Sequence, residues 1–388
     1  MNKKEIAYIR NQFKLNNERM KIHDIFNVYV KKETSEIYHE VCQSFALLEQ
    51  ETQELFLTNF KKVLPGSLDT KLFELKFRYG VEDSTQSILY EALETDAAED
   101  WKESMMQIVE KMVRQTVYEF DTVITFIRGE LRKPVQKRNP ETEEGGMDST
   151  YSSPFILCSV NKIEQPKKAL FFDYVEKEFK SSNILDPIIN LNKPLTGFFF
   201  PAINNHGADV NHILYYTGKT NQPDYEFIED VLHCEEIMTA QDDKDCFDFI
   251  LQQVVGDEVE STIIANVYQE IDQIVQENEE DEEDDSQPML DSQDIERILT
   301  VSGVENVNKD KVEHALKTVL DDEKYEFKAN NIVPKTIKIE TKVANLTLKP
   351  KDLQYVKYIT FQGKRCILIE IEDDVVLEGF RLEAAEFN

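Results

Sequence analysis

A run of acidic residues beyond the middle of the chain is the feature that most constrains its fold. Residues 277–286 read ENEEDEEDDS, so eight of these ten side chains are carboxylates. Like charges at this density repel one another and find no local partners, which disfavours their burial. We therefore expect residues 277–290 to form an extended, solvated linker between an N-terminal domain, residues 1–276, and a C-terminal domain, residues 291–388.

The formal charge of −31 is concentrated in one part of the chain. Residues 1–138 hold 21 Lys and Arg against 23 Asp and Glu, residues 139–297 hold 9 against 36, and residues 298–388 hold 14 against 16. A field of this sign repels nucleic-acid phosphates and attracts basic proteins. The acidic run is therefore interpreted either as a solubilising linker or as a polyanion that binds a basic protein partner.

Length and cysteine usage favour a cytoplasmic protein without membrane contact. The 388 residues suffice for two or three domains. The N-terminus lacks the apolar core of a signal peptide, and the longest apolar stretches, such as residues 198–203, fall far short of the roughly 20 residues that span a bilayer. The cysteines are scattered and never spaced as CxxC, which indicates neither a disulfide framework nor a zinc site. They are Cys42, Cys158, Cys234, Cys246 and Cys366.

Apolar periodicity predicts an α+β fold with a mixed or antiparallel sheet and flanking helices. Helical spacing marks residues 6–13, 56–64, 101–112, 247–254 and 264–274, and strand-like runs mark residues 21–45 (a hairpin), 72–77, 117–127, 155–162, 169–175, 195–203 and 209–217. A mobile loop is expected at about residues 134–153, which are rich in Pro, Gly and charge. After the acidic run, a helical hairpin and then β-hairpins predict a smaller α+β domain.

Five stretches carry a resemblance that spans nearly the whole chain. They read LNNERMKIHDIFNVYVKKETSEIYHE, EDSTQSILYEAL, PFILCSVNK, ADVNHILYYTGK and FQGKRCILIEIEDD. Together they resemble a bacterial family known as a domain of unknown function, number four-three-one-seven. The resemblance implies a bacterial cytosolic protein and supplies no reaction, ligand or catalytic residue. We do not expect the acidic run to be a shared feature.

One polar cluster has residue types that could bind a metal. In the sequence NNHGADVNH, His206, Asp209 and His212 lie within seven residues between two predicted strands. Imidazole and carboxylate groups together can bind a divalent metal. The spacing matches no established metal signature, however, and a segment rich in Asn, Gly and Asp is also what a β-turn requires.

A second pattern suggests a metal-dependent nuclease. Such enzymes need carboxylates to hold Mg²⁺ and a lysine near the attacking water. In IKIETKV, Glu340 and Lys342 are expected on the same face of a strand, with Asp321 or Asp322 upstream as a third group. The alternative is an ordinary pair of charges facing solvent, since the E-x-K pattern recurs elsewhere in this highly charged chain.

A local basic segment could contact phosphates. Arg128, Arg132, Lys133, Lys137 and Arg138 are opposed in sequence only by Glu130. Cations that converge in space would give a salt-sensitive grip without base specificity. The alternative is the solvated end of a strand and the start of a loop.

Motif searches favour a binding protein over an enzyme. The chain contains no G-x-x-x-x-G-K-[ST], G-x-G-x-x-G, H-E-x-x-H or G-x-S-x-G pattern, and no cofactor is indicated. We expect a cytosolic, non-catalytic binding or regulatory protein that acts through protein partners. The alternatives are a metal-dependent hydrolase or nuclease, and a nucleic-acid-associated protein that uses the basic segment.

Overall fold

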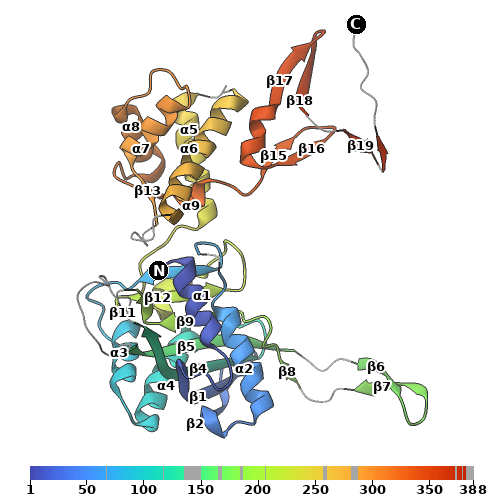
Figure 1. Ribbon diagram of the computed structural model, residues 1–388. Helices are drawn as coiled ribbons and strands as arrows, with labels where there is room; N and C mark the ends of the chain where they lie inside the picture. Colours follow the sequence, from blue (N-terminus) through green and yellow to red (C-terminus); the bar gives the residue numbers. More distant parts are fainter. Residues whose placement is uncertain are drawn as a thin grey trace, which may run out of the picture. The chain divides into compact units, whose positions relative to one another are not determined.

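The chain divides into a first unit, Met1–Thr239, and a second unit, Ala240–Asn388 (Figure 1). The computed structural model describes residues 1–66, 68–116, 118–134, 150–164, 168–183, 187–205, 207–256, 260–280, 287–371, 374–377 and 379–381. In this part of the chain no helix combines the length and the apolar composition needed to cross a membrane.

An antiparallel sheet forms the centre of the first unit. Its strands follow the spatial order β2 (Ile37–Ser44), β1 (Met20–Val30), β4 (Thr122–Pro134), β5 (Thr150–Glu164), β9 (Thr196–Phe200), β12 (His212–Thr217) and β3 (Leu72–Lys76), and β8 (Ile188–Ile189) pairs with β5. Each neighbouring pair along this order is antiparallel. The predicted α+β fold is confirmed, including the hairpin of residues 21–45.

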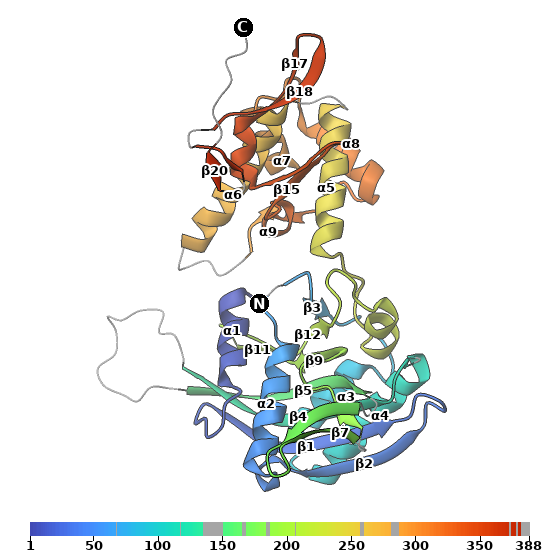
Figure 2. The same cartoon turned by 90° about the vertical axis from the view of Figure 1, so that its right-hand side faces the viewer.

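Helices cover both faces of this sheet (Figures 1 and 2). One apolar cluster joins the sheet to α1 (Lys3–Gln12) and α2 (Gln50–Val63), and the other joins it to α3 (Thr85–Glu94) and α4 (Ala98–Gln115). Neighbouring residues of one strand enter opposite clusters. Phe126 packs with the α4 cluster that contains Trp101, whereas Ile127 packs with the α2 cluster that contains Phe60. The apolar stripe predicted at residues 101–112 is therefore core.

A β-bulge interrupts the pairing of β1 with β4. The register shifts between Ile22 and Asp24, which places His23 at the bulge opposite Gly129 and Arg128. A Cβ atom at Gly129 would lie 2.3 Å from the Lys21 carbonyl oxygen, so the close approach of the two backbones requires glycine. Bulges of this kind bend a strand and change the direction of its side chains.

The strands on either side of the predicted mobile loop are longer than expected. Pro134 still belongs to β4, and Thr150 to Ser153 already pair in β5. Residues 135–149 lie outside the described residues. Arg132 of β4 pairs with Ser152 of β5, and Lys133 pairs with Tyr151, so the ladder continues beyond the predicted strand ends.

Shorter elements complete the first unit. The hairpin of β6 (Lys168–Asp173) and β7 (Glu178–Asn183) and the hairpin of β10 (Ala202–Asn204) and β11 (Gly207–Asp209) each form a separate two-stranded ladder. A 3-10 turn, η1 (Phe45–Leu47), follows β2, and a π-helical turn, η2 (Phe227–Val231), follows β12.

The second unit contains a helical core and small hairpins. The helices are α5 (Ala240–Val255), α6 (Ser261–Glu280), α7 (Ser292–Val301), α8 (Lys309–Leu320) and α9 (Ala329–Ile332). The ladders join β13 (Met289–Leu290) to β14 (Phe327–Lys328), β15 (Ile337–Glu340) to β16 (Asn345–Leu348), β17 (Val356–Phe361) to β18 (Lys364–Ile369), and β19 (Val376–Leu377) to β20 (Phe380–Arg381). The 3-10 helix η3 (Pro350–Tyr355) precedes β17.

The division into units precedes the acidic run at which we expected the boundary. Helices α5 and α6 belong to the second unit because their apolar side chains share one core with α7, α8 and α9. Asp243 of α5 is buried in this core, where it accepts hydrogen bonds from Tyr325 and Asn331, both at 2.7 Å. The first four residues of the acidic run continue α6 to Glu280 rather than forming an extended linker, and residues 281–286 lie outside the described residues.

Substituting Gly129 by Ala should destabilise the first unit by about 1–3 kcal/mol, the usual cost of overpacking, because the added methyl group meets the backbone of β1. Urea unfolding followed by circular dichroism measures the loss. Gly66→Ala is the matched control, since its Cβ would meet nothing closer than 3.7 Å. Equal stability of the two variants would contradict the close backbone approach.

The unit boundary predicts how fragments of the chain behave. A fragment of residues 240–388 should melt cooperatively with helical circular dichroism, because it keeps α5 and α6 in the core. A fragment of residues 291–388 should lack a cooperative transition, because it loses the apolar side chains that these two helices supply. Cooperative melting of the shorter fragment would restore the boundary at the acidic run.

Candidate functional site

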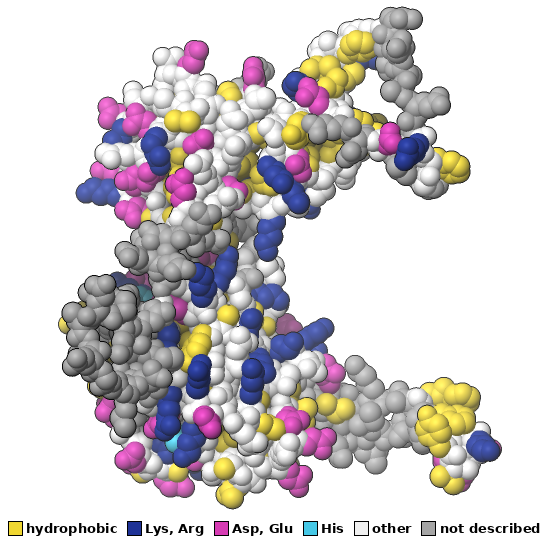
Figure 3. All heavy atoms as spheres, in the orientation of Figure 1, with side chains coloured by type: hydrophobic (Ala, Val, Ile, Leu, Met, Phe, Trp, Pro, Cys, Tyr) yellow, Lys and Arg dark blue, Asp and Glu magenta, His cyan; other side chains and the backbone are white. Residues whose placement is uncertain are grey.

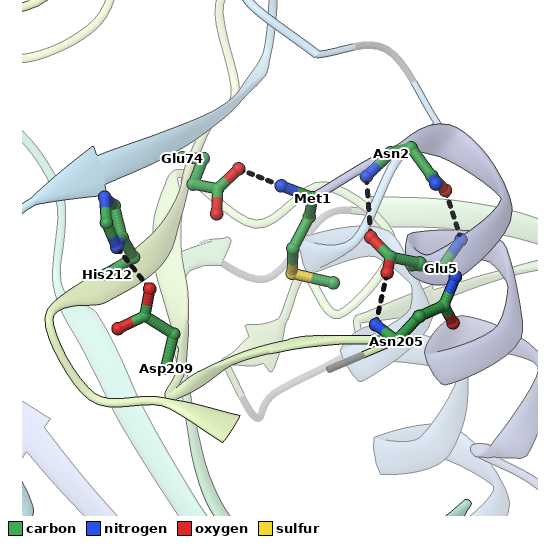
Figure 4. A network of polar contacts seen from close by, with 7 residues as sticks. All are labelled: Met1, Asn2, Glu5, Glu74, Asn205, Asp209 and His212. Carbon is green, nitrogen blue, oxygen red and sulfur yellow. Dashed lines mark hydrogen bonds and ion pairs between the residues drawn. The ribbon is translucent and has the colours of Figure 1, made fainter. Parts of the chain in front are cut away.

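Polar side chains fix the start of α1 to two other parts of the first unit (Figure 4). The buried carboxylate of Glu5 accepts hydrogen bonds from the Asn2 backbone N–H at 2.8 Å and from the Asn205 backbone N–H at 2.6 Å. The Asn2 side chain accepts in return from the Glu5 backbone N–H at 2.9 Å, which completes a capping box. The Met1 amino group contacts Glu74 of β3. These contacts satisfy the helix end and engage both carboxylate oxygens of Glu5.

Asp209 and His212, two of the predicted metal ligands, lie together next to this corner (Figure 4). The Nδ1 atom of His212 lies 2.7 Å from Oδ2 of Asp209, and Oδ1 of Asp209 accepts the Asn211 backbone N–H at 2.9 Å. Burial by itself raises the pKa of Asp209, but the hydrogen bonds from Asn211 and His212 outweigh it and hold this pKa below its usual value. His206 lies outside the described residues.

A His–carboxylate pair can act as a general base or supply two ligands to a metal. Among the described residues no group of three His, Cys, Asp or Glu side chains is placed to hold a metal ion. The pair instead spans the turn between β11 and β12, which Gln86 of α3 fixes through hydrogen bonds to the Val210 carbonyl at 3.0 Å and the Asn211 side chain at 3.2 Å. These contacts support the turn interpretation of this segment.

The three described cations of the predicted basic segment do not share one face of the sheet. Side chains alternate along β4, so Arg128 and Arg132 project from the sheet face covered by α3 and α4, whereas Lys133 projects from the face covered by α1. Lys133 accordingly lies 2.7 Å from the Asn205 side-chain oxygen and over the ring of Tyr8. Lys137 and Arg138 lie outside the described residues.

Arg128 has a structural role. Its Nε atom lies 2.7 Å from Asp24 Oδ2, and its two Nη groups donate to the carbonyl oxygens of Thr95 at 2.7 Å and Asp96 at 3.1 Å. The guanidinium also lies 5.3 Å from the ring centre of Trp101. Only 14% of this side chain is exposed, and each of its three nitrogen atoms already has a partner, so the guanidinium ties β4 to the segment between α3 and α4.

A groove that sequence reasoning missed lies beside the β1 bulge. It has a volume of about 640 Å³ and is lined on its polar side by Lys21, His23, Asp24, Arg128 and Glu130. The bulge brings His23 Nε2 to 3.9 Å from Glu130 Oε1. In the sequence, the only sign of this groove is Gly129 among the charged residues at the end of β4. A glycine inside a strand often marks a bulge or a close backbone approach.

The predicted nuclease pattern does not hold. Strand β15 ends at Glu340, and residues 341–344 form the turn of the hairpin, which Thr341 stabilises through its contacts with Ala344. Lys342 therefore lies in the turn rather than beside Glu340 on a strand face. Asp321 occupies the left-handed C-cap of α8, and Asp322 accepts the Lys324 backbone N–H at 2.9 Å. Turn geometry overrode the alternation that the sequence predicted.

A different set of cations gathers on the outer side of α1 and α2. Figure 3 shows Lys and Arg side chains over these two helices on the face of the first unit turned to the viewer. We define the basic surface by the Lys and Arg residues of α1, of the turn after it, and of the last turn of α2. They are Lys3, Lys4, Arg10, Lys14, Lys61 and Lys62.

The carboxyl ends of the two helices bring four of these cations together, namely Arg10, Lys14, Lys61 and Lys62. Phe13 and Phe60 pack with ring centres 5.9 Å apart, and Arg10 lies close to Gly66, just beyond α2. In the described part of the chain, none of the six cations takes part in an ion pair. By contrast Lys76, Lys102 and several others are each paired with a glutamate. The basic surface is the strongest candidate interface in the first unit.

Substitution of Arg128 separates its structural role from a binding role. Arg128→Gln should lower the free energy of unfolding by roughly 3 kcal/mol, because it leaves the largely buried Asp24 carboxylate without its charged partner. Chemical denaturation measures the change. The exposed neighbour on the same face serves as control, and Arg132→Gln should stay within about 0.5 kcal/mol of the unmodified protein. A stable Arg128→Gln protein would return this residue to the binding candidates.

The comparison with protein families places the chain in one of them. The profile of the domain of unknown function (DUF4317) matches residues 1–380, so the chain belongs to that family. A search of the curated proteins gave no match. The family resemblance expected from the sequence is thereby confirmed.

Proposed function

We propose that this member of the DUF4317 family is a non-catalytic binding protein whose first unit holds an acidic segment of a protein partner. The observation that carries the proposal is the basic surface, six cations without anionic partners among the described residues of a chain with net charge −31. Cations on a rim raise the association rate of an oppositely charged partner and select against others.

Lys3 and Lys4 are not placed where they would stabilise their own helix. Lys3 and Lys4 stand in the first turn of α1, where the helix dipole disfavours positive charge. Lys61 and Lys62 stand in the last turn of α2, where the dipole favours it. Helix stability therefore accounts for the second pair and not for the first. A ligand with negative charge would account for both.

The size of the surface favours a short acidic segment over nucleic acid. Helix α1 has 10 residues and is about 15 Å long. A nucleic acid would extend beyond this patch and across a molecule of strongly negative net charge. A partner segment with a few carboxylates can end within the patch, where salt screening limits the influence of charges farther than roughly 8 Å away. Nucleic acid is therefore the second candidate ligand.

The acidic run and the cysteines bear on the partner and the location of the protein. The acidic residues 277–286 would suit a basic partner, which gives the chain complementary charge in its two units. A cytoplasmic location is supported by the five cysteines, all of which are free.

The enzymatic alternative is a hydrolase centred on the groove beside the β1 bulge. His23 and Glu130 lie 3.9 Å apart there and could exchange a proton with a substrate. Both side chains are more than one third exposed, and Glu130 also accepts a hydrogen bond from the Ser152 hydroxyl at 3.4 Å. A solvated pair of this kind supports catalysis less well than the basic surface supports binding.

Neutralising the basic surface should weaken binding of an acidic peptide. The full chain is titrated with a fluorescent poly-glutamate peptide and, separately, with a labelled single-stranded oligonucleotide, at low and at physiological salt. We expect the triple variant Lys3→Gln, Lys4→Gln, Lys62→Gln to bind the peptide at least about ten-fold more weakly, because each exposed cation contributes a few tenths to 1 kcal/mol.

The control removes the same charge elsewhere. Lys338→Gln, Lys342→Gln, Lys349→Gln changes three exposed lysines of the second unit and should leave peptide affinity unchanged. Equal losses in the two variants would mean that net charge, and not the basic surface, controls binding. Tighter binding of the oligonucleotide than of the peptide would overturn the preference for a protein partner.

A further inference from the structure

The outer edge of β2 has no partner in the described part of the chain. Strand β2 lies at one end of the strand order of the large sheet, and its only described pairing is with β1 (Figures 1 and 2). It is eight residues long. The backbone N–H and C=O groups on the free side of such a strand form a template for another strand.

The opposite edge of the same sheet is covered at the end of β3. At β3, the Glu235 backbone N–H donates to the Lys76 carbonyl at 2.8 Å, and the Arg78 backbone N–H donates to the His233 carbonyl at 2.8 Å. Phe77 and Cys234 add an isolated β-bridge between the same segments. The fold therefore protects one edge with its own chain and leaves the other open.

Apart from an irregularity in its pairing at Tyr38, β2 lacks the usual protection of an open edge. The strand reads IYHEVCQS, with no Pro, Lys or Arg, and its single charged residue, Glu40, is paired with Lys102 at 2.8 Å. Ile37, Tyr38 and Val41 are large apolar side chains with exposed fractions of 36%, 65% and 39%. Natural proteins place charges or prolines on edges that must stay unpaired.

We propose that β2 pairs antiparallel with β2 of a second copy of this chain, around a two-fold axis at Val41. In this register Val41 faces its own symmetry mate, Glu40 faces Cys42, and His39 faces Gln43. A register centred one residue earlier would place two Glu40 carboxylates opposite each other, which is unfavourable. A β-branched residue at the axis packs well against its mate. The two sheets then form one continuous sheet.

The symmetry has a consequence for the basic surface. Two antiparallel edge strands are related by an axis perpendicular to the sheet, and such a rotation keeps each face of the sheet on its own side. The α1 and α2 layers of both copies therefore lie on one side of the joined sheet. If the proposed function holds, the dimer presents two basic surfaces in the same direction and can bind a partner with two acidic segments more tightly than a monomer does. The strand pairing itself does not depend on that function.

The full-length chain is examined by sedimentation equilibrium over a range of concentrations. We expect a monomer–dimer equilibrium, and we expect Val41→Lys to raise the dissociation constant at least about ten-fold, because it places two like charges at the axis. Leu55→Lys adds the same charge at an exposed position of α2 and should leave the equilibrium unchanged. Circular dichroism and thermal melting show that both variants fold.

A covalent trap tests the register. Under mild oxidation Val41→Cys should give a disulfide-linked dimer on a non-reducing gel, whereas Leu55→Cys and the unmodified chain should not. A chain that stays monomeric at every concentration overturns the proposal, and an extended segment of another protein would then be the occupant of the edge. A dimer that Val41→Lys leaves intact, or that Val41→Cys fails to trap, also overturns it.

Discussion

Each strand in the middle of the first unit's sheet directs apolar side chains to both faces, and two helices remove each face from water. Burial of apolar area on both sides is the dominant favourable term for such a layered arrangement. It also determines which surfaces are free for other purposes. The inner faces of the helices are committed to the core, so only their outer sides and the edges of the sheet can carry partners.

The charged groups of the first unit differ in whether the fold supplies them with partners. Glu5, Asp24 and Asp209 are each held by hydrogen bonds or an ion pair within the fold. The cations of the basic surface have no such partners in the part of the chain that is described. A charge whose environment is water contributes little to stability, so its placement is open to selection for binding. The same reasoning separates the buried Arg128 from the exposed lysines of α1.

The second unit shows how packing can override a charge pattern. Helices α5 and α6 are acidic on the outside, yet their apolar stripes complete a core with α7, α8 and α9. Buried Asp243 is tolerated because Tyr325 and Asn331 donate hydrogen bonds to it. The boundary between the two units precedes the acidic run, because the core of the second unit already includes α5 and α6.

Local patterns in the sequence determined much of the secondary structure and the fold class. Period-two alternation located β1, β2, β17 and β18, and helical periodicity located α4, α5, α6, α7 and α8, because these patterns reflect burial on a strand or helix face. The family was recognisable from the same stretches. The counts of acidic and basic residues also showed that the first 138 residues are nearly neutral, although they did not show how the charges are arranged in space.

Only the tertiary structure decided which residues share a surface. Strand alternation separates Lys133 from Arg128 and Arg132, and a hairpin turn removes Lys342 from the face that carries Glu340. Packing of Phe13 on Phe60 brings Arg10 and Lys14 towards the end of α2, about fifty residues away in sequence. The open edge of β2 likewise follows from the order of the strands. The packing of α1 on α2 and the open edge of β2 depend on contacts between segments that are distant in sequence, and a single sequence does not encode such contacts in any local pattern.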